Sequence, residues 1–306
     1  MGCGSSAPVE LTGSETHDEL RDLVRRGSVD AAVVCVSNEE CDLSLGRKAW
    51  GKEPLGVKGA NALGEAIGRP TCKAKKLVLR GTKLGGGAQG PPAGMGLKKF
   101  AAGLAANTSI EVLDLSGNEI GDYEAEKLAA ALETNRTLKT LILFQNRIGK
   151  EGGGSGAKAI GKALRSGGND ALRELHLNLN YIDSNGTTKL AEALATNASL
   201  KVLRYETGDM FDLMNPTRGG LGEMHGLGGF PSGRGLGGEF QSSYLGAEAL
   251  RALSKARPDL DITFTSKAQH KHKLSGTIQH LHYAGGKLVR TVDYKGDSGP
   301  PVVTAS

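Results

Sequence analysis

The segment IEVLDLSGN at residues 110–118 recurs with small changes as LKTLILFQN at 138–146 and LRELHLNLN at 172–180. Apolar residues occupy the first, fourth and sixth positions of each copy, and asparagine occupies the ninth. The interval from Leu113 to Leu141 is 28 residues, that from Leu141 to Leu175 is 34, and that from Leu175 to Leu203 is again 28. A motif that recurs at this period is typical of a solenoid, in which short units stack on one another.

A second apolar run follows each segment at helical spacing, as in the series Ala125, Leu128, Ala129 and Leu132. Each unit is therefore expected to be a strand followed by a helix, and stacking would join the units in one core of leucine and alanine. The ninth-position asparagines are expected to satisfy backbone groups of the tight turn; they are Asn118, Asn146 and Asn180. The glycosylation sequons at Asn107, Asn135 and Asn197 coincide with turns that start the next strand, so we interpret them as features of the fold.

This pattern resembles the leucine-rich repeats of the ribonuclease-inhibitor class, and the resemblance covers about residues 41–264. It implies an α/β fold: a short horseshoe of about six repeats, with a parallel sheet on the concave side and helices on the convex side. Weaker copies begin at Leu43 and Leu77, and a sixth begins at Leu200. In these three copies the ninth-position asparagine is replaced by Lys48, Thr82 and Gly208, respectively.

The flanks of the array differ from it in composition. Residues 1–14 are expected to be a flexible N-terminus, and 15–40 a capping segment with an amphipathic helix at 15–26. Residues 206–243 contain 11 glycines and are predicted to be an insertion, after which the sixth helix resumes at Leu245. In the C-terminal part, 265–306, alternating segments at 277–283 and 287–294 around Gly285-Gly286 predict a β-hairpin.

The N-terminal sequence predicts a lipid anchor. Met1-Gly2-Cys3-Gly4-Ser5-Ser6 fits the myristoylation motif, so Gly2 is a candidate for myristate and Cys3 for palmitate. Two chains are expected because a single myristoyl group binds membranes only marginally. We therefore expect a cytoplasmic protein held peripherally on a membrane. No run of 18 apolar residues is present, and four cysteines in 306 residues do not indicate a disulfide framework.

Several short motifs suggest catalysis, but each lacks a part that the chemistry requires. In the P-loop-like segment 46–53, Glu53 replaces the hydroxyl residue that would bind magnesium, and Pro54 follows. A G-x-G-x-x-G pattern at 85–90 is followed by two prolines, which block the helix that would face a pyrophosphate. Ser298 lies in a protease-like GDSGP segment without the β-barrels that such a serine needs. We predict no enzymatic activity, no catalytic residue and no cofactor.

Four histidines form two H-x-H pairs, at His270 and His272 and at His280 and His282. Paired histidines on one strand face can bind a metal, but the surrounding lysines favour a solvated basic hairpin, which would also suit anionic lipid. We therefore predict no metal site. The net charge of +5 arises from mixed signs, so no nucleic-acid partner is expected either.

The resemblance implies binding through the concave face, where residues between the strand leucines point outward. Ile142 and Phe144 would be solvent-facing apolar residues at the centre of the arc, surrounded by polar ones, as in a binding hot spot. Alternatively, the insertion or the hairpin covers them. The candidate partner-binding residues are Val78, Arg80, Asp114, Ser116, Ile142, Phe144, His176, Asn178 and Arg204.

These features favour a non-catalytic scaffold or adaptor that recruits a protein partner to a membrane. The alternative is a regulator of a small GTPase, because a GTPase-activating protein for a nuclear-transport GTPase is built from similar repeats. This chain lacks the strongly acidic C-terminal tail of that family, and its functional residues have no counterpart that we can place here.

Overall fold

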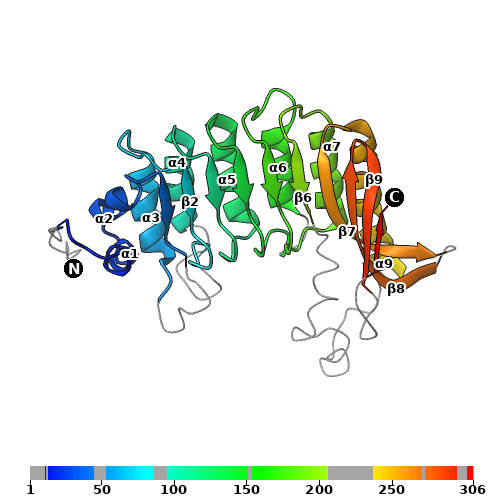
Figure 1. Ribbon diagram of the computed structural model, residues 1–306, viewed down its shortest axis with the longest axis horizontal. Coiled ribbons are helices and arrows are strands. Elements are labelled where there is room, and N and C mark those ends of the chain that lie inside the picture. The colour runs from blue at the N-terminus through cyan, green and yellow to red at the C-terminus, as the bar shows by residue number, and fades with distance from the viewer. Residues whose placement is uncertain are drawn as a thin grey trace, which may run out of the picture.

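The computed structural model describes residues 11, 13–44, 53–85, 95–150, 154–205, 237–270, 273–294 and 302–305. Strands and helices alternate along the chain, and successive units lie side by side from the N-terminal to the C-terminal end of an elongated molecule (Figure 1). The strands form one layer and the helices a second layer packed against it. This is the stacked strand-and-helix arrangement that the sequence predicts.

Six parallel pairings join the first seven strands of the sheet. In order its strands are β1 (Glu40–Asp42), β2 (Lys76–Val78), β3 (Val112–Asp114), β4 (Thr140–Ile142), β5 (Glu174–His176), β6 (Val202–Arg204) and β7 (Asp261–His270), and each is parallel to the next. Three antiparallel strands follow: β8 (Lys273–Ala284), β9 (Lys287–Tyr294) and β10 (Val302–Ala305). The strand order therefore equals the sequence order from β1 to β10.

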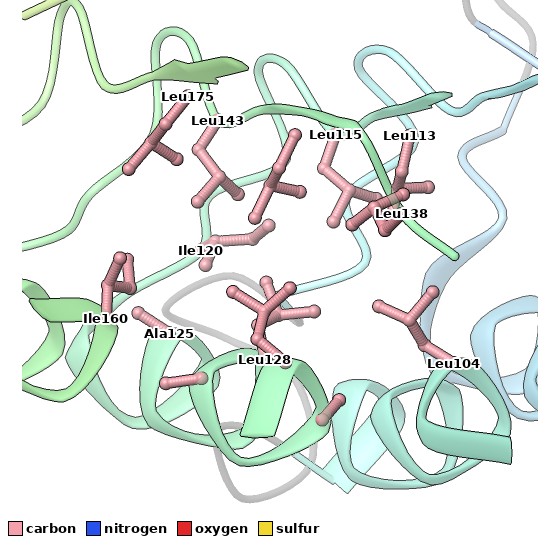
Figure 2. Packing of buried hydrophobic residues seen from close by; sticks show 14 of the residues in the cluster. Leu104, Leu113, Leu115, Ile120, Ala125, Leu128, Leu138, Leu143, Ile160 and Leu175 are labelled. Carbon is pink, nitrogen blue, oxygen red and sulfur yellow. The ribbon is translucent and has the colours of Figure 1, made fainter. Parts of the chain in front are cut away.

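The helices that cover the sheet are α3 (Gly56–Ile67), α4 (Met95–Ala106), α5 (Asp122–Thr134), α6 (Ser155–Leu164), α7 (Ser184–Ala195) and α9 (Gly237–Ala256). Figure 2 shows the layer between strands and helices, where Leu113 and Leu115 face Leu128. Strand leucines and helix alanines of neighbouring units are fully or almost fully buried in one continuous cluster. Small side chains on the helices let them lie close to the sheet, so a core with few aromatic residues is still closely packed.

The ninth-position asparagines form a ladder inside the turns that follow the strands. Asn118 Oδ1 accepts hydrogen bonds from the Thr82 and Leu84 amides of the preceding unit, and its Nδ2 donates to the Leu79 carbonyl. Asn146 Oδ1 in turn accepts from the Asn118 amide, and Asn180 Oδ1 accepts from the Ile148 amide of the unit before it. Thr82 takes the asparagine's place in its own unit by donating its hydroxyl to the Leu79 carbonyl.

A second asparagine ladder closes the opposite side of each unit, between helix and strand. Asn135 is typical: its Nδ2 donates to the Leu104 and Asn107 carbonyls of the previous unit, and its Oδ1 accepts from two amides of its own turn. Asn107, Asn169 and Asn197 repeat this arrangement. In the last unit Arg257 replaces the asparagine and donates to the Leu194 and Leu200 carbonyls. The sequons at Asn107, Asn135 and Asn197 are thus buried structural positions.

The N-terminal end is covered by α1 (His17–Arg26) and α2 (Val29–Cys35). Helix α1 begins at a capping box formed by Thr16 and Glu19, and the buried Arg21 side chain donates to the Leu43 and Glu53 carbonyls. The helix expected at 15–26 is present, whereas α2 was not predicted.

The register of the first repeat differs from our prediction by two residues. Cys41, and not Leu43, pairs with Leu77 of the second repeat. Both registers bury apolar side chains, because a shift of two residues keeps each residue on the same face of a strand. Cys41, which is 5% exposed, occupies the place of a leucine.

Two C-terminal boundaries also need correction. Helix α9 starts at Gly237, inside the insertion predicted at 206–243 and eight residues before Leu245. Between Glu239 and Ala256 the only glycine is Gly246, so the glycine-rich composition ends earlier than the count over 206–243 suggested. The parallel array also gains a seventh strand, since β7 pairs with β6 and buries Ile262 and Phe264. Strands β8 and β9 are joined at Gly285 and Gly286, both with positive φ, as a two-residue hairpin turn requires.

Candidate functional site

A groove of about 1050 Å³ runs along the strand face between the N-terminal and central units. Residues of β1, β2, β4 and β5 form its floor, and the turns after β2 to β5 form one wall. Six of the nine predicted binding residues line it: Val78, Arg80, Ser116, Ile142, Phe144 and His176. The structure therefore brings most of the predicted set together in one concavity.

The centre of this groove is apolar. Phe144, at the end of the β4 unit, is 38% exposed, and Ile142 beside it is half-buried. Leu179 and Tyr181 of the next turn also line the groove. A partly exposed aromatic ring next to aliphatic side chains is the type of surface at which binding energy concentrates in protein interfaces.

Asp114 lies beneath this surface and is 2% exposed, although its position in the strand predicts an outward side chain. Its Oδ2 accepts a hydrogen bond of 2.6 Å from Arg80 Nε, and its Oδ1 accepts from the Ser116 amide and hydroxyl. The Arg80 side chain remains 61% exposed. Asp114 thus holds the Arg80 side chain in place, and most of the Arg80 side chain stays exposed to solvent.

Ion pairs border the groove on several sides. Arg147 contacts Glu119 at 2.9 Å in the turn wall, and Lys76 contacts Glu40 at 3.3 Å at the N-terminal end. On the floor, His176 Nε2 lies 2.7 Å from Glu174 Oε1. The Arg147–Glu119 and Lys76–Glu40 pairs bring both signs of charge to the rim, which is therefore polar without being strongly acidic or basic.

Asn178 and Arg204, also predicted as binding residues, do not line the groove. Asn178 is half-buried, and its backbone carbonyl accepts from the Gln145 amide. Arg204 donates to Asp261 and Thr263 on β7, and His282 of β8 lies 2.7 Å from the same Asp261 carboxylate. Arg204 therefore ties the repeat array to the C-terminal strands.

Other lining residues were missed at the sequence level: Asp42, Lys76, Glu119, Gln145, Arg147, Leu179 and Tyr181. Most of them are sequence neighbours of a ninth-position asparagine. They lie in the turns that form one wall of the groove, and not on the strands. The asparagines themselves provide the signal that would have found them, because their neighbours occupy the same place in every unit.

Some sequence predictions lie outside the described residues. They are the lipidation sites Gly2 and Cys3, most of the P-loop-like segment, the prolines after Gly85 and the segment around Ser298.

Within the described residues, Cys35, Cys41 and Cys72 are buried and form no disulfide. Cys35 and Cys41 lie in hydrogen-bonding contact, which lowers the pKa of the Cys35 thiol and raises that of Cys41.

The strand register separates the two histidine pairs. His270 pairs with Lys273 at the tip of the β7–β8 hairpin, whereas His280 pairs with Thr265, five residues further along β7. At about 3.3 Å per residue these backbone positions are roughly 16 Å apart. Among the described residues, no cluster of three histidine, cysteine or acidic side chains has the geometry to hold a metal.

Known proteins with similar sequences share the repeat. A family model described as "Leucine Rich repeat" matches residues 106–129 and 134–161, which hold two consecutive strand-and-helix units of this arc. Residues 106–161 therefore carry leucine-rich repeats. Chicken (Gallus gallus) leucine-rich repeat-containing protein 45 is 36% identical over 101 residues, and mouse (Mus musculus) NACHT, LRR and PYD domains-containing protein 12 is 28% identical over 166 residues.

These matches cover 32% and 54% of the leucine-rich-repeat chain, but only 14% of the length of each relative. Among solved structures, leiomodin-1 actin-binding site 2 aligns over 49% of this chain and 76% of that one, with 23% identity and a TM-score of 0.38. A score this low does not show that the two structures superpose as wholes.

In the described part of the chain, no helix is long and apolar enough to cross a membrane.

Proposed function

We propose that this leucine-rich-repeat protein is a non-catalytic scaffold that binds a protein partner in the concave groove. One observation carries the proposal: Phe144 and Ile142 present an apolar centre on the strand face, and polar and paired charged side chains surround it. Excluding water from such a centre stabilises a complex, while the polar rim keeps the free protein soluble.

The regular backbone supports the same role. Two asparagine ladders hold the turns of consecutive units in register, so the groove is shaped before a partner arrives. A preformed surface loses little conformational entropy on binding.

Affinity capture with two matched aspartate variants tests the proposal. Phe144→Asp places a charge in the groove, and Tyr123→Asp places one on α5, away from the groove, where the tyrosine is 44% exposed. Quantitative mass spectrometry of co-purified proteins should show at least one partner depleted about tenfold by Phe144→Asp and retained by Tyr123→Asp. The same partner list for wild type and Phe144→Asp would contradict the proposal.

We further propose that lipid chains on Gly2 and Cys3 bring the scaffold to a membrane. The support is the N-terminal motif alone. Metabolic labelling with an alkyne myristate should label the wild type and not Gly2→Ala, and Cys3→Ser should keep the label but move protein from the membrane to the soluble fraction. Absence of label on the wild type would contradict this part of the proposal.

Regulation of a small GTPase remains the alternative, and none of the described groove residues favours it. GTP hydrolysis by a panel of small GTPases, measured with and without this protein, separates the two hypotheses. A scaffold leaves the hydrolysis rates unchanged, whereas stimulation of any one GTPase would support the alternative.

A further inference from the structure

Three buried cysteines lie where the N-terminal cap joins the first repeat. Cys35 ends α2, Cys41 is the middle residue of β1, and Cys72 lies in the loop between α3 and β2. The Val36 carbonyl accepts hydrogen bonds of 2.9 and 3.0 Å from the two amides that follow Cys72. The backbone beside Cys35 is therefore bonded to the backbone beside Cys72. Two stretches of chain, before and after α3, thus bring three thiols to one junction.

The core does not require a cysteine at position 41. In register with it, the next five strands place a leucine, namely Leu77, Leu113, Leu141, Leu175 and Leu203. A thiol is smaller than the leucine side chain and buries less apolar surface, so Cys41 contributes less to the core than its counterparts do. Cysteine adds what leucine lacks, because its sulfur can be oxidised.

Two of the three thiols are paired with each other. The sulfurs of Cys35 and Cys41 lie in hydrogen-bonding contact, whereas Cys72 Sγ accepts a hydrogen bond of 3.3 Å from the Ser109 hydroxyl. The contact with Cys41 lowers the pKa of the Cys35 thiol, and the same contact together with burial raises the pKa of Cys41. Cys35 is thus the sulfur of the pair that ionises first, and the thiolate is the nucleophilic form of cysteine.

Cys35 and Cys41 are only 8% and 5% exposed, but they belong to a terminal unit of the array. A terminal unit of a repeat array contacts a neighbour on one side only, so it opens at a lower free energy than the central units. Helices α1 and α2 form this N-terminal end of the molecule (Figure 1). A small oxidant such as hydrogen peroxide can therefore reach Cys35 by local opening, while the central repeats stay folded.

We propose that Cys35 and Cys41 form a reversible regulatory disulfide when hydrogen peroxide oxidises the protein. The Cys35 thiolate attacks one peroxide oxygen and the O–O bond breaks. This step gives a sulfenic acid and a hydroxide, which takes up the proton released by Cys35. The Cys41 sulfur then attacks the Cys35 sulfur, and the displaced hydroxide leaves with the Cys41 proton as water. Two thiols and one peroxide become one disulfide and two waters, and a thiol such as glutathione reduces the disulfide again by exchange.

The disulfide ties the end of α2 to β1 and so restrains the opening of the terminal unit. Asp42, next to Cys41, lines the groove, and its backbone carbonyl contacts the His17 ring of α1. Oxidation therefore holds the cap and the N-terminal end of the groove together, whatever partner the groove binds. Disulfides in reducing compartments are usually transient ones that sense the redox state.

Peptide mapping of the full-length protein after exposure to hydrogen peroxide tests the proposal. Cys35 and Cys41 lie in one tryptic peptide, residues 27–47, and Glu39 and Glu40 lie between them. A second cleavage after glutamate therefore separates the two cysteines unless a disulfide joins them. With free thiols blocked, the oxidised peptide should lack two hydrogen atoms, hold together after the second cleavage, and come apart when dithiothreitol is added.

Two variants and one second measurement sharpen the test. Cys72→Ala is the matched control and should still form the disulfide. Cys41→Ala should stop the reaction at the sulfenic acid of Cys35, which dimedone traps. In the oxidised wild type, amide hydrogen exchange in residues 36–41 should be about tenfold slower than in the reduced protein, because opening is restrained.

The decisive outcomes are read on the wild type, so they do not depend on the folding of a variant. A peptide 27–47 that stays reduced while Cys3 or Cys72 is oxidised would overturn the inference. A disulfide between Cys41 and Cys72 would overturn the assigned pair. Equal hydrogen exchange in the oxidised and reduced proteins would overturn the restraint on the terminal unit, and with it the regulatory role.

Discussion

At the scale of single residues, asparagine stabilises this arc in two different ways. Asn118, Asn146 and Asn180 lie in the turns after the strands, and their role follows from the ninth position of the motif. The second ladder, which includes Asn135, was visible in the sequence only as glycosylation sequons. Each buried amide satisfies backbone groups of two units at once, which a single-unit pattern cannot reveal.

Replacing Asn118 with alanine should strongly destabilise the protein. The change leaves the buried amides of Thr82 and Leu84 without their acceptor and removes one of the two side-chain donors to the Leu79 carbonyl. We expect a loss of about 2–4 kcal/mol in the free energy of unfolding, measured by chemical denaturation. Asn185→Ala, at an exposed asparagine, is the control and should change it by less than about 0.5 kcal/mol. A loss below about 1 kcal/mol for Asn118→Ala would contradict the ladder's role.

Asp259 should make part of the stability depend on pH. Its carboxylate accepts from Arg257 and Lys201, which lowers the pKa of Asp259 below its usual range. Because the folded pKa is depressed, the stabilisation is present above the unfolded pKa of about 3.9 and is lost as the pH falls below it. The side chain is 44% exposed, so solvent screening limits the contribution to about 1 kcal/mol.

Asp259→Asn should therefore lower the free energy of unfolding at pH 7, and the difference from wild type should shrink between pH 5 and pH 2.5. Denaturation curves recorded across this range provide the measurement. Asp170→Asn, at a carboxyl that is 83% exposed, is the control. A difference that stays constant with pH would contradict the assigned ion pairs.

At the scale of elements, helices α3 and α4 are in backbone contact through glycines. A Cβ at Gly64 would lie 2.6 Å from the backbone of Lys99, and a Cβ at Gly103 would collide with the Gly64 carbonyl. Because backbone atoms cannot move aside as a flexible side chain can, these two glycines set the distance between the first two repeat helices.

Gly103→Ala should thus push the two helices apart and destabilise the N-terminal units. We expect a loss of about 3 kcal/mol, seen as a fall of about 9 °C in the thermal midpoint by circular dichroism. Ala102→Ser, at the exposed neighbouring position, should leave the midpoint within about 1 °C. A midpoint unchanged by Gly103→Ala would show that the helices are not in close contact.

Element prediction succeeded where the repeat is regular and failed at its ends. Residues 110–200 contain strong leucine periodicity, and the strands there start where the motif places them. In the first repeat, alternation alone could not decide between Cys41 and Leu43, since both face the core. The seventh strand was missed because Asp261 to Phe264 follows a long insertion and lacks the leucines of the motif.

At the scale of the whole molecule, the groove forms because the units stack. Residues between the strand leucines of successive units then lie side by side on one face of the sheet. The sequence predicted which strand residues share that face, and Val78, Ile142 and Phe144 do line it. It could not predict that Arg80 covers Asp114 or that the turn residues Gln145 and Leu179 form a wall, because both depend on how neighbouring units lie against one another. The irregular ends, where repeats lose the motif, are likewise set by contacts between units.

Binding at the groove centre is the central claim, and site-specific photo-crosslinking tests it most directly. The photoreactive residue p-benzoylphenylalanine replaces Phe144 in one variant and Tyr123 in another, so that two exposed aromatic positions on different faces are compared. Irradiation of cells that express the full chain should give a discrete adduct of higher mass from position 144 and none from position 123. No adduct from position 144, or equal adducts from both positions, would contradict the assignment of the concave groove as the binding site.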